Sequence, residues 1–332
     1  MDRIDKARAF LKKLICVLIF ALVFVLLFCC VTELVRDKRY ADSAGLMYQP
    51  GYDGYGVDIV LAGSSHMLDG VNAQAMTMEL RKGVINIAQN SQIIPETYYA
   101  LMETLRVNAP SLVVLDIYKL LQDQKISSRE ALHFTLDGMR LGVPKIRAVY
   151  DLVEPGERAE YMFPVIAYHT RWKELGRTDL EAAMDTFDKF RTRGGQLLDG
   201  NYDNSNYQLP GRDEVAQIGP VSMDYLQRIV DLCDEKGVDL LLVAVPFGDD
   251  YDDEYKGKRQ QTVNAAEKWA NEKGIHFLNM PYMNDLTGLD MKTDFADRAH
   301  LNESGNRKIT DFLANYIKEN YFKPDGTLGT TV

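Results

Sequence analysis

The longest apolar stretch of the chain lies near its N-terminus. Residues 14–32 (LICVLIFALVFVLLFCCVT) contain no charged side chain over nineteen positions. A helix of this length, at about 1.5 Å per residue, reaches ~28 Å, close to the ~30 Å hydrocarbon core of a bilayer. A buried helix of a soluble domain normally has a polar stripe, and this stretch has none. The pattern predicts one transmembrane helix.

The residues on either side of this stretch bear on its orientation and processing. Basic side chains outnumber acidic ones by five to two in residues 1–13, which by the positive-inside rule places the N-terminus in the cytoplasm and the C-terminal part outside the plasma membrane. A cleaved signal peptide is the alternative, but its apolar stretch is usually shorter and ends in small residues, whereas this one ends in LFCCV. We favour a single-pass protein with a cytoplasmic tail at 1–13 and a signal anchor at 14–32.

Beyond the anchor, short apolar segments alternate with helical patterns. Five segments of about 4–8 apolar or β-branched residues, bounded by Gly, Pro or Asn, are typical of buried strands; they are 57–62, 84–87, 112–117, 238–245 and 275–280. Apolar residues at helical spacing lie between them, at 95–107, 223–235 and 260–273. This alternation predicts a parallel sheet with helices on both faces.

The alternation is interrupted once, by roughly residues 119–220. This insert has helical patterns, an aromatic-rich segment (YMFPVIAYHTRW) and a Gly-rich polar one (GGQLLDGNYDNSNY). Inserts on the loops of such sheets commonly shape the substrate cleft. We therefore expect a juxtamembrane linker at 33–55, one extracytoplasmic domain at 56–322 with a largely helical insert, and a C-terminal tail at 323–332.

Composition narrows the class of protein further. The 332 residues are 46% hydrophobic and include 18 Tyr and 13 Phe, which argues against a disordered chain. The net charge of −10 argues against nucleic-acid binding, which needs clustered Lys and Arg. Three of the four cysteines lie in the apolar stretch, so Cys233 has no partner for an internal disulfide outside it. A hydrophobic core must then stabilise the domain.

Candidate chemistry lies near both ends of the predicted domain. The segment Gly63-Ser64-Ser65 follows the first strand and presents hydroxyl groups where ligands of α/β sheets bind, although such a turn is common. Asp297 precedes His300 by three residues, ahead of the last amphipathic helix. An Asp so placed can accept the imidazole Nδ1–H, as the acid of a Ser-His-Asp triad does, and a serine nucleophile needs such a base. A helix cap with a surface histidine is the alternative for this pair.

Together, the Gly-x-Ser turn and the later Asp-x-x-His-Leu-Asn motif resemble the SGNH/GDSL hydrolase superfamily. The resemblance covers about residues 56–118 and 222–320. It implies an α/β fold, namely a flavodoxin-like three-layer α/β/α sandwich with a parallel sheet. It also implies a catalytic triad of Ser65, Asp297 and His300, with Ser65 as the nucleophile.

The membrane anchor and the Gly-Ser-Ser turn look closest to the cell-envelope branch, which includes DltD-like proteins and AlgJ/AlgX-like polysaccharide O-acetyltransferases. This resemblance implies acyl transfer to a cell-envelope polysaccharide or glycopolymer through an acyl-serine intermediate, alongside a membrane-bound O-acyltransferase and without a cofactor. If water replaces the sugar hydroxyl, the same site is an esterase.

The oxyanion-hole segments depart from the family pattern. The second block reads NIAQNSQ without a glycine, and the third strand ends LDIY without Gly-x-Asn-Asp. Because backbone N–H donors need no particular side chain, we assign this role to the N–H of Ser65 together with Asn90 and Ser91. The departures leave an alternative open, a catalytically inactive glycan-binding or scaffolding protein of the same fold.

The insert contains a second group of functional side-chain types. His169, Arg171 and Trp172 combine a base, a cation and a large aromatic ring, which predicts a sugar platform or a carboxylate clamp. An Arg–Trp packing pair on a helix is the alternative. The acidic stretch at 248–254 lacks the spacing of an EF-hand loop, so no metal site is predicted.

Overall fold

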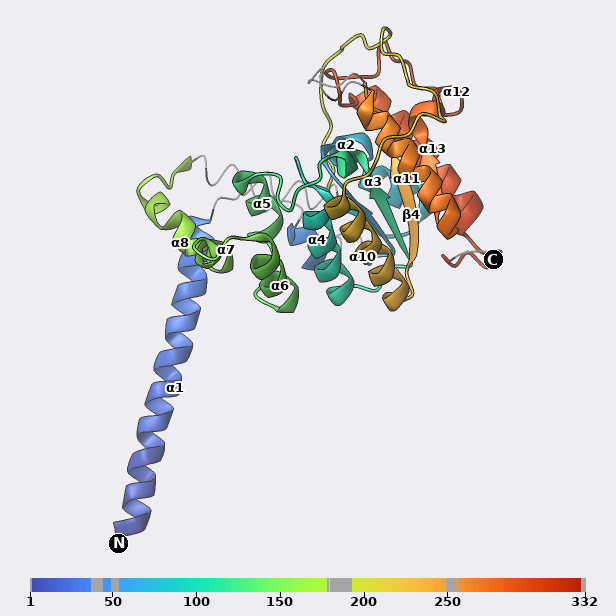
Figure 1. Ribbon diagram of the computed structural model, residues 1–332. Helices are drawn as coiled ribbons and strands as arrows, with labels where there is room; N and C mark the ends of the chain where they lie inside the picture. Colours follow the sequence, from blue (N-terminus) through green and yellow to red (C-terminus); the bar gives the residue numbers. More distant parts are fainter. Residues whose placement is uncertain are drawn as a thin grey trace.

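The computed structural model describes residues 2–36, 44–48, 54–177, 179, 193–248, 255 and 257–329. Parts of the predicted linker, insert and tail, and residues 249–254 of the acidic stretch, lie outside this range. Helix α1 (Asp2–Val35) projects from an α/β domain (Figure 1). Its segment Lys6–Thr32 is the one described helix long and apolar enough to cross a membrane, and its side chains from residue 6 to residue 27 are exposed.

Five parallel strands form the sheet, in the order β2-β1-β3-β4-β5. The strands are β1 (Ile59–Ala62), β2 (Val84–Asn86), β3 (Leu112–Asp116), β4 (Asp239–Ala244) and β5 (His276–Asn279). Each predicted strand is confirmed, with ends that differ by at most two residues. This order is that of flavodoxin-like folds, so the predicted α/β class is also confirmed.

Helices cover both faces of the sheet and make three layers. One face packs against α3 (Ala73–Leu80) and α13 (Glu303–Tyr321), and the other against α4 (Ile94–Val107), α10 (Pro220–Lys236) and α11 (Lys258–Lys273). Because successive side chains of a strand point to opposite faces, Ile59 and Leu61 enter the first core while Val60 and Ala62 enter the second. This double burial explains why the strands are apolar throughout.

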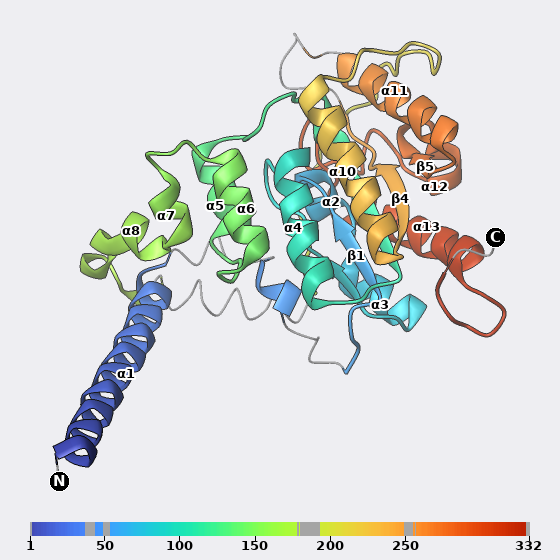
Figure 2. The ribbon, with the colours of Figure 1, turned by 60° about the horizontal axis from the view of Figure 1, so that its bottom comes forward.

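The first part of the insert is a row of short helices between the sheet domain and α1 (Figure 2). Helices α5 (Arg129–Leu136) and α6 (Val143–Leu152) pack against α4, while α7 (Arg158–Met162), α8 (Pro164–Tyr168) and the 3-10 turn η4 (His169–Lys173) lie at the end of α1. Shorter elements complete the described chain: η2 (Ala44–Tyr48), α2 (Ser65–Gly70), η3 (Tyr118–Leu121), η6 (Met280–Tyr282) and α12 (Asn284–Thr287).

The strand order determines where a site can form. The chain passes from β1 to β2 on one side and to β3 on the other, so the order reverses between β1 and β3. Loops that leave the carboxyl ends of these two strands diverge there, and ligands of open α/β sheets bind in the crevice between them. The turn after β1 and helix α2 begin at this point.

Candidate active site

The turn that carries Ser65 depends on a glycine. Strand β1 ends at Ala62, and Gly63 has φ +145°, a conformation that side chains disfavour. A Cβ at Gly63 would lie 2.9 Å from Cβ of Asp116, so the space also requires glycine. Ser64 then adopts an extended conformation, and Ser65 is the first residue of α2. The turn therefore places Ser65 at the carboxyl edge of the sheet.

Asp116, at the end of β3, lies beside this turn. Its carboxylate accepts hydrogen bonds from the N–H groups of Val245 (3.1 Å) and Tyr118 (3.4 Å), and the Ser64 hydroxyl donates to it at 3.5 Å. Burial raises the pKa of Asp116 to about 7, against the opposing effect of these donors. Asp116 thus holds together the loops that follow β1, β3 and β4.

The Asp297–His300 loop brings a base to Ser65. Asp297 Oδ1 accepts the N–H groups of Ala299 and His300, each at 2.8 Å, which closes a tight turn. Nδ1 of the His300 ring lies 3.0 Å from Asp297 Oδ2, and Nε2 lies 2.9 Å from Ser65 Oγ. Residues 235 positions apart in the sequence are thus in hydrogen-bond contact, in the geometry of a nucleophile, a base and an orienting acid.

Helix α13 links the base loop to the nucleophile helix. Asn302 caps α13, since its side chain accepts the N–H of Gly305 at 3.1 Å. One turn later, the Asn306 amide donates to the backbone carbonyl of Asp69 in α2 at 2.6 Å. The two halves of the site are therefore both in contact with one helix, which positions them relative to each other.

The Gly-rich part of the insert also contacts the loop that contains Asp297 and His300. The Asn204 side chain, 3% exposed, donates to the carbonyl of Asp297 at 3.2 Å. The N–H of Tyr202 donates to the Phe295 carbonyl at 2.8 Å. No local sequence pattern marks Asn204, because its contact with Asp297 spans 93 residues.

An aromatic group lies next to His300. The buried His66 ring stacks on Tyr118, and its centroid is 4.7 Å from that of His300. The Arg259 guanidinium lies 4.0 Å from the centre of the Tyr118 ring, a cation–π contact. Burial, with a further contribution from His300, holds the pKa of His66 well below its usual value. The same burial thus disfavours a positive charge on His66 beside His300.

A third carboxyl group, Asp69, lies one turn after Ser65 on α2. It is 4% exposed, and its Oδ1 has no hydrogen-bond partner among the described residues. Burial raises its pKa to about 7, and the negative charge of Asp297 adds to the effect. Spacing alone could have identified it, since positions i and i+4 of a helix share a face.

The assigned oxyanion donors lie in the turn after β2. The Gln89 N–H donates to the Gly63 carbonyl at 3.3 Å, which places this turn beside the nucleophile turn. Asn90 and Ser91 are exposed, and Ser91 has φ +60°. Within the described residues, neither N–H donates to another backbone group. Their assignment remains a prediction.

The insert cluster lies away from this edge. His169 is exposed, and its Nδ1 lies 2.8 Å from the Ile166 carbonyl in its own turn. Arg171 donates to the Val35 carbonyl of α1 at 2.8 Å and pairs with Asp179, while Trp172 is 64% exposed. The structure does not bring His169, Arg171 or Trp172 to Ser65; their contacts are with α1 and with their own segment.

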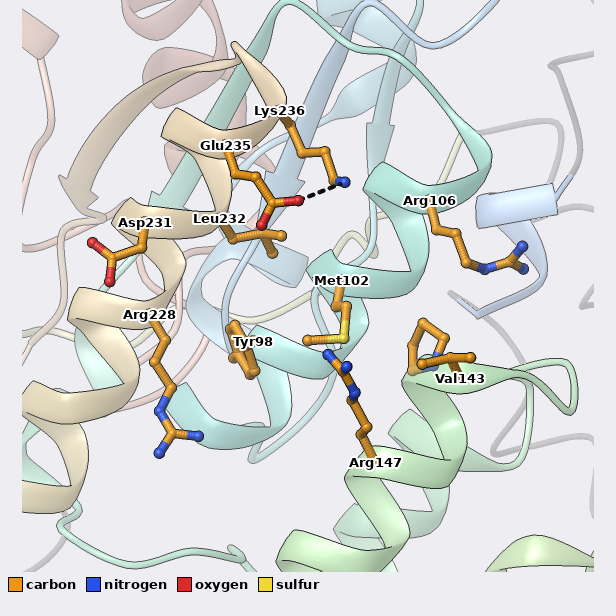
Figure 3. Close-up of a pocket in the computed structure, with 11 residues that line it drawn as sticks. Tyr98, Met102, Arg106, Val143, Arg147, Arg228, Asp231, Leu232, Glu235 and Lys236 are labelled. Atoms are coloured by element: carbon orange, nitrogen blue, oxygen red, sulfur yellow. Dashed lines mark hydrogen bonds and ion pairs between the residues drawn. The ribbon is translucent and has the colours of Figure 1, made fainter.

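A cavity of about 350 Å³ lies between α4, α6 and α10 (Figure 3), and Ser65 is not among the residues that line it. Arg106 and Lys236, which line it, lie at the C-terminal ends of α4 and α10, and hence at the amino edge of the sheet. Lys236 pairs with Glu235 at 3.1 Å. Across the described ranges, no three His, Cys, Asp or Glu side chains are arranged to hold a metal ion.

Comparisons with known proteins give only loose similarities. No protein-family model matches the chain, and no curated protein matches it. A proposed acylhydrolase from Bacteroides fragilis is similar in structure, with 11% identity, a TM-score of 0.39, and coverage of 85% of this chain and 95% of that one. A GDSL-like lipase from Bacteroides thetaiotaomicron has 12% identity, a TM-score of 0.38, and coverage of 85% and 97%. Sequence identities and TM-scores this low establish no shared activity.

Proposed function

We propose that the chain is a membrane-anchored serine esterase or O-acyltransferase of the SGNH type, acting on acyl esters of a cell-envelope glycan. One observation supports this above all others: the continuous hydrogen-bonded chain from Ser65 Oγ through the His300 ring to the Asp297 carboxylate, with distances of 2.9 and 3.0 Å. A serine hydroxyl is a weak nucleophile, and this arrangement is the one that activates it.

In the proposed first step, Ser65 Oγ attacks the carbonyl carbon of the acyl donor. With Nδ1–H donated to Asp297, Nε2 of His300 is free to accept the hydroxyl proton. The carbonyl π pair moves to oxygen, and backbone N–H groups of Ser65, Asn90 and Ser91 are the proposed donors to that oxyanion. Collapse breaks the bond to the leaving alkoxide, which takes the proton from His300 and leaves acyl-Ser65.

The second step repeats the chemistry in reverse. His300 Nε2 takes a proton from an acceptor hydroxyl, whose oxygen attacks the acyl-serine carbonyl. Collapse releases Ser65 with its proton restored. A sugar hydroxyl as acceptor gives transfer, and water gives hydrolysis, so the outcome depends on which acceptor occupies the crevice.

The proposal also includes the location of the protein, its acceptor and its partner. Residues 14–32 anchor the protein in the plasma membrane, with the N-terminus cytoplasmic and the domain outside. A polysaccharide or glycopolymer of the envelope supplies the acceptor, and a membrane-bound O-acyltransferase is the proposed donor partner. The apolar, exposed character of α1 and the basic residues before it support this placement.

Hydrolysis of p-nitrophenyl acetate by the detergent-solubilised full chain tests the chemistry. We expect Ser65→Ala to lower kcat/KM by about 10³-fold or more. Ser64→Ala is the matched control, because it removes a neighbouring buried hydroxyl with only a 3.5 Å contact to Asp116. Equal activity in the unchanged chain and Ser65→Ala contradicts the nucleophile assignment.

A second assay separates transfer from hydrolysis. The chain is incubated with p-nitrophenyl acetate and a soluble oligosaccharide, and the sugar is examined by mass spectrometry for one added acetyl group. Acetylated sugar that depends on Ser65 supports a transferase, whereas acetate alone supports an esterase. Glycan binding that Ser65→Ala leaves intact, with no ester cleavage by any variant, supports the inactive binding module instead.

A further inference from the structure

The end of α1 is held by a defined part of the insert. The segment 158–173, comprising α7, α8 and η4, is called here the α7–η4 segment. Phe163 packs edge-on against Phe28 of α1, with ring centroids 6.0 Å apart and planes at 79°. Arg171 Nη1 donates to the Val35 carbonyl at 2.8 Å. On the neighbouring part of the insert, the backbone carbonyl of Asp137 accepts a hydrogen bond from Arg36 Nη1 at 3.3 Å. These contacts fix the domain to the last two turns of α1.

One of these contacts lies within the apolar run. Phe28 precedes Thr32, the end of the uncharged run, by four residues, or about 6 Å along a helix. If residues 14–32 occupy the hydrocarbon core, Phe163 lies at a depth where lipid surrounds α1. The α7–η4 segment therefore reaches below the level at which the span ends.

The side chains of this segment suit that depth. Phe163, Ile166 and Trp172 are 38%, 44% and 64% exposed. The Lys173 ammonium lies 5.7 Å from the Trp172 ring centre. Tryptophan prefers the region of lipid headgroups, where its ring is partly apolar and its N–H finds a polar partner, and a lysine can extend its charge toward water.

We infer that the α7–η4 segment is a second membrane contact, which inserts Phe163 and Ile166 at the apolar edge of the leaflet facing the domain and places Trp172 among the headgroups. This inference rests on the proposed crossing of the bilayer by α1. The partner is the lipid bilayer rather than a second protein, because the Phe28 contact places the segment at the depth of the apolar run.

The consequence for the active site is a fixed orientation. Two attachments, the helix and the α7–η4 segment, restrict rotation of the domain about the anchor. In Figure 1, α2 lies on the upper side of the domain, while α1 leaves it downward. The carboxyl edge of the sheet, where α2 begins, then lies on the side of the domain away from the bilayer, toward polymer rather than toward membrane lipid.

Tryptophan fluorescence of the full chain in phosphatidylcholine vesicles tests this contact. The chain has two tryptophans, and Trp269→Phe leaves Trp172 as the only reporter. We expect blue-shifted emission, quenching by about twofold in vesicles whose lipids carry bromine near the headgroup end of the acyl chains, and protection from aqueous iodide. Solvent-like emission with no bromolipid quenching overturns the inference.

A control reports on α1 itself. Phe20→Trp, in a chain that also carries Trp172→Phe and Trp269→Phe, places the reporter within the apolar run. A quenched reporter at position 20 with an unquenched Trp172 rejects the second contact and keeps the anchor. No quenching at either position rejects the anchor as well. If Trp269→Phe lowers Tm, the difference in quenching between the unchanged chain and Trp172→Phe gives the same information.

Discussion

The carboxyl edge of the sheet and the α7–η4 segment contain the same kinds of side chain, but they hold them differently. At the edge, the His300 ring has Asp297 on one nitrogen and Ser65 on the other. In the α7–η4 segment, His169 is exposed, and its Nδ1 lies 2.8 Å from the carbonyl of Ile166 in its own turn. Both regions lie within one chain and both contain aromatic rings.

The two regions differ in how their side chains are held, and not in which residue types they contain. Ser65, Asp297 and Asn204 come from three distant segments and are fixed by contacts between those segments. Catalysis requires such fixed relative positions. The exposed aromatic rings of the α7–η4 segment suit contact with a lipid bilayer, which needs no precise arrangement of side chains.

The largest expected effect contrasts the two histidines. We expect His300→Ala to lower kcat/KM for p-nitrophenyl acetate by about 10³-fold or more, because it removes the base proposed to take the Ser65 proton, whose Nε2 lies 2.9 Å from Ser65 Oγ. We expect His169→Ala to leave it within about twofold, since the side chain is exposed and away from Ser65. Equal losses in the two variants would show that the insert reaches the site.

The next contrast concerns two glycines. Gly63→Ala forces a positive φ on alanine and brings Cβ to 2.9 Å from Asp116, so we expect a loss of about 2–4 kcal/mol in the free energy of unfolding. Gly156→Ala, in the insert, meets no atom within 4 Å and is the matched control. Chemical denaturation of both variants in the same detergent measures the difference in the free energy of unfolding. A Gly63→Ala variant as stable as the unchanged chain contradicts the close packing at the turn.

A smaller effect is expected at the segment that supports the base loop. Asn204→Ala removes the hydrogen bond to the Asp297 carbonyl, so we expect kcat to fall by about tenfold while KM changes little. Asn201→Ala, an exposed position nearby, is the control. A change confined to Tm, with kcat retained, would mean that Asn204 stabilises the fold without positioning the base.

The smallest effect is a change in the pH dependence of stability. The pKa of Asp69 is raised from about 3.8 to about 7 by burial, so the folded state binds this proton more tightly than the unfolded state does. Stability therefore falls as pH rises through this range. We expect Asp69→Asn to flatten that decline between about pH 4 and pH 7, the interval between the two pKa values, while Asp116 and Glu96, whose pKa values are also raised to about 7, retain part of it. An identical slope in the variant contradicts the assignment.

Much of the fold was predictable because local chemistry encodes it. A strand buried on both faces must be apolar throughout, so segments such as 112–117 were identified to within a residue or two of β3. Helix α4 was similarly clear from its stripe and from Pro95 in its first turn. These features depend on the residues of the segment itself and on no distant partner.

The site was predictable only where a motif marks it. Two short motifs predicted that Ser65, Asp297 and His300 lie together, and they are in hydrogen-bond contact; their catalytic role stays a prediction. Asn204 was missed, and the location of Trp172 was not foreseen, because each depends on packing between segments far apart in sequence. An exposed tryptophan in an insert has the same local sequence whether it faces a sugar or a lipid.

The central claim is that Ser65 is the nucleophile. The full chain is labelled with a fluorophosphonate, digested, and the modified residue is located by mass spectrometry. We predict a single adduct on Ser65 that is lost in Ser65→Ala and reduced in His300→Ala. An adduct on another serine, or equal labelling of Ser65→Ala, would contradict the account.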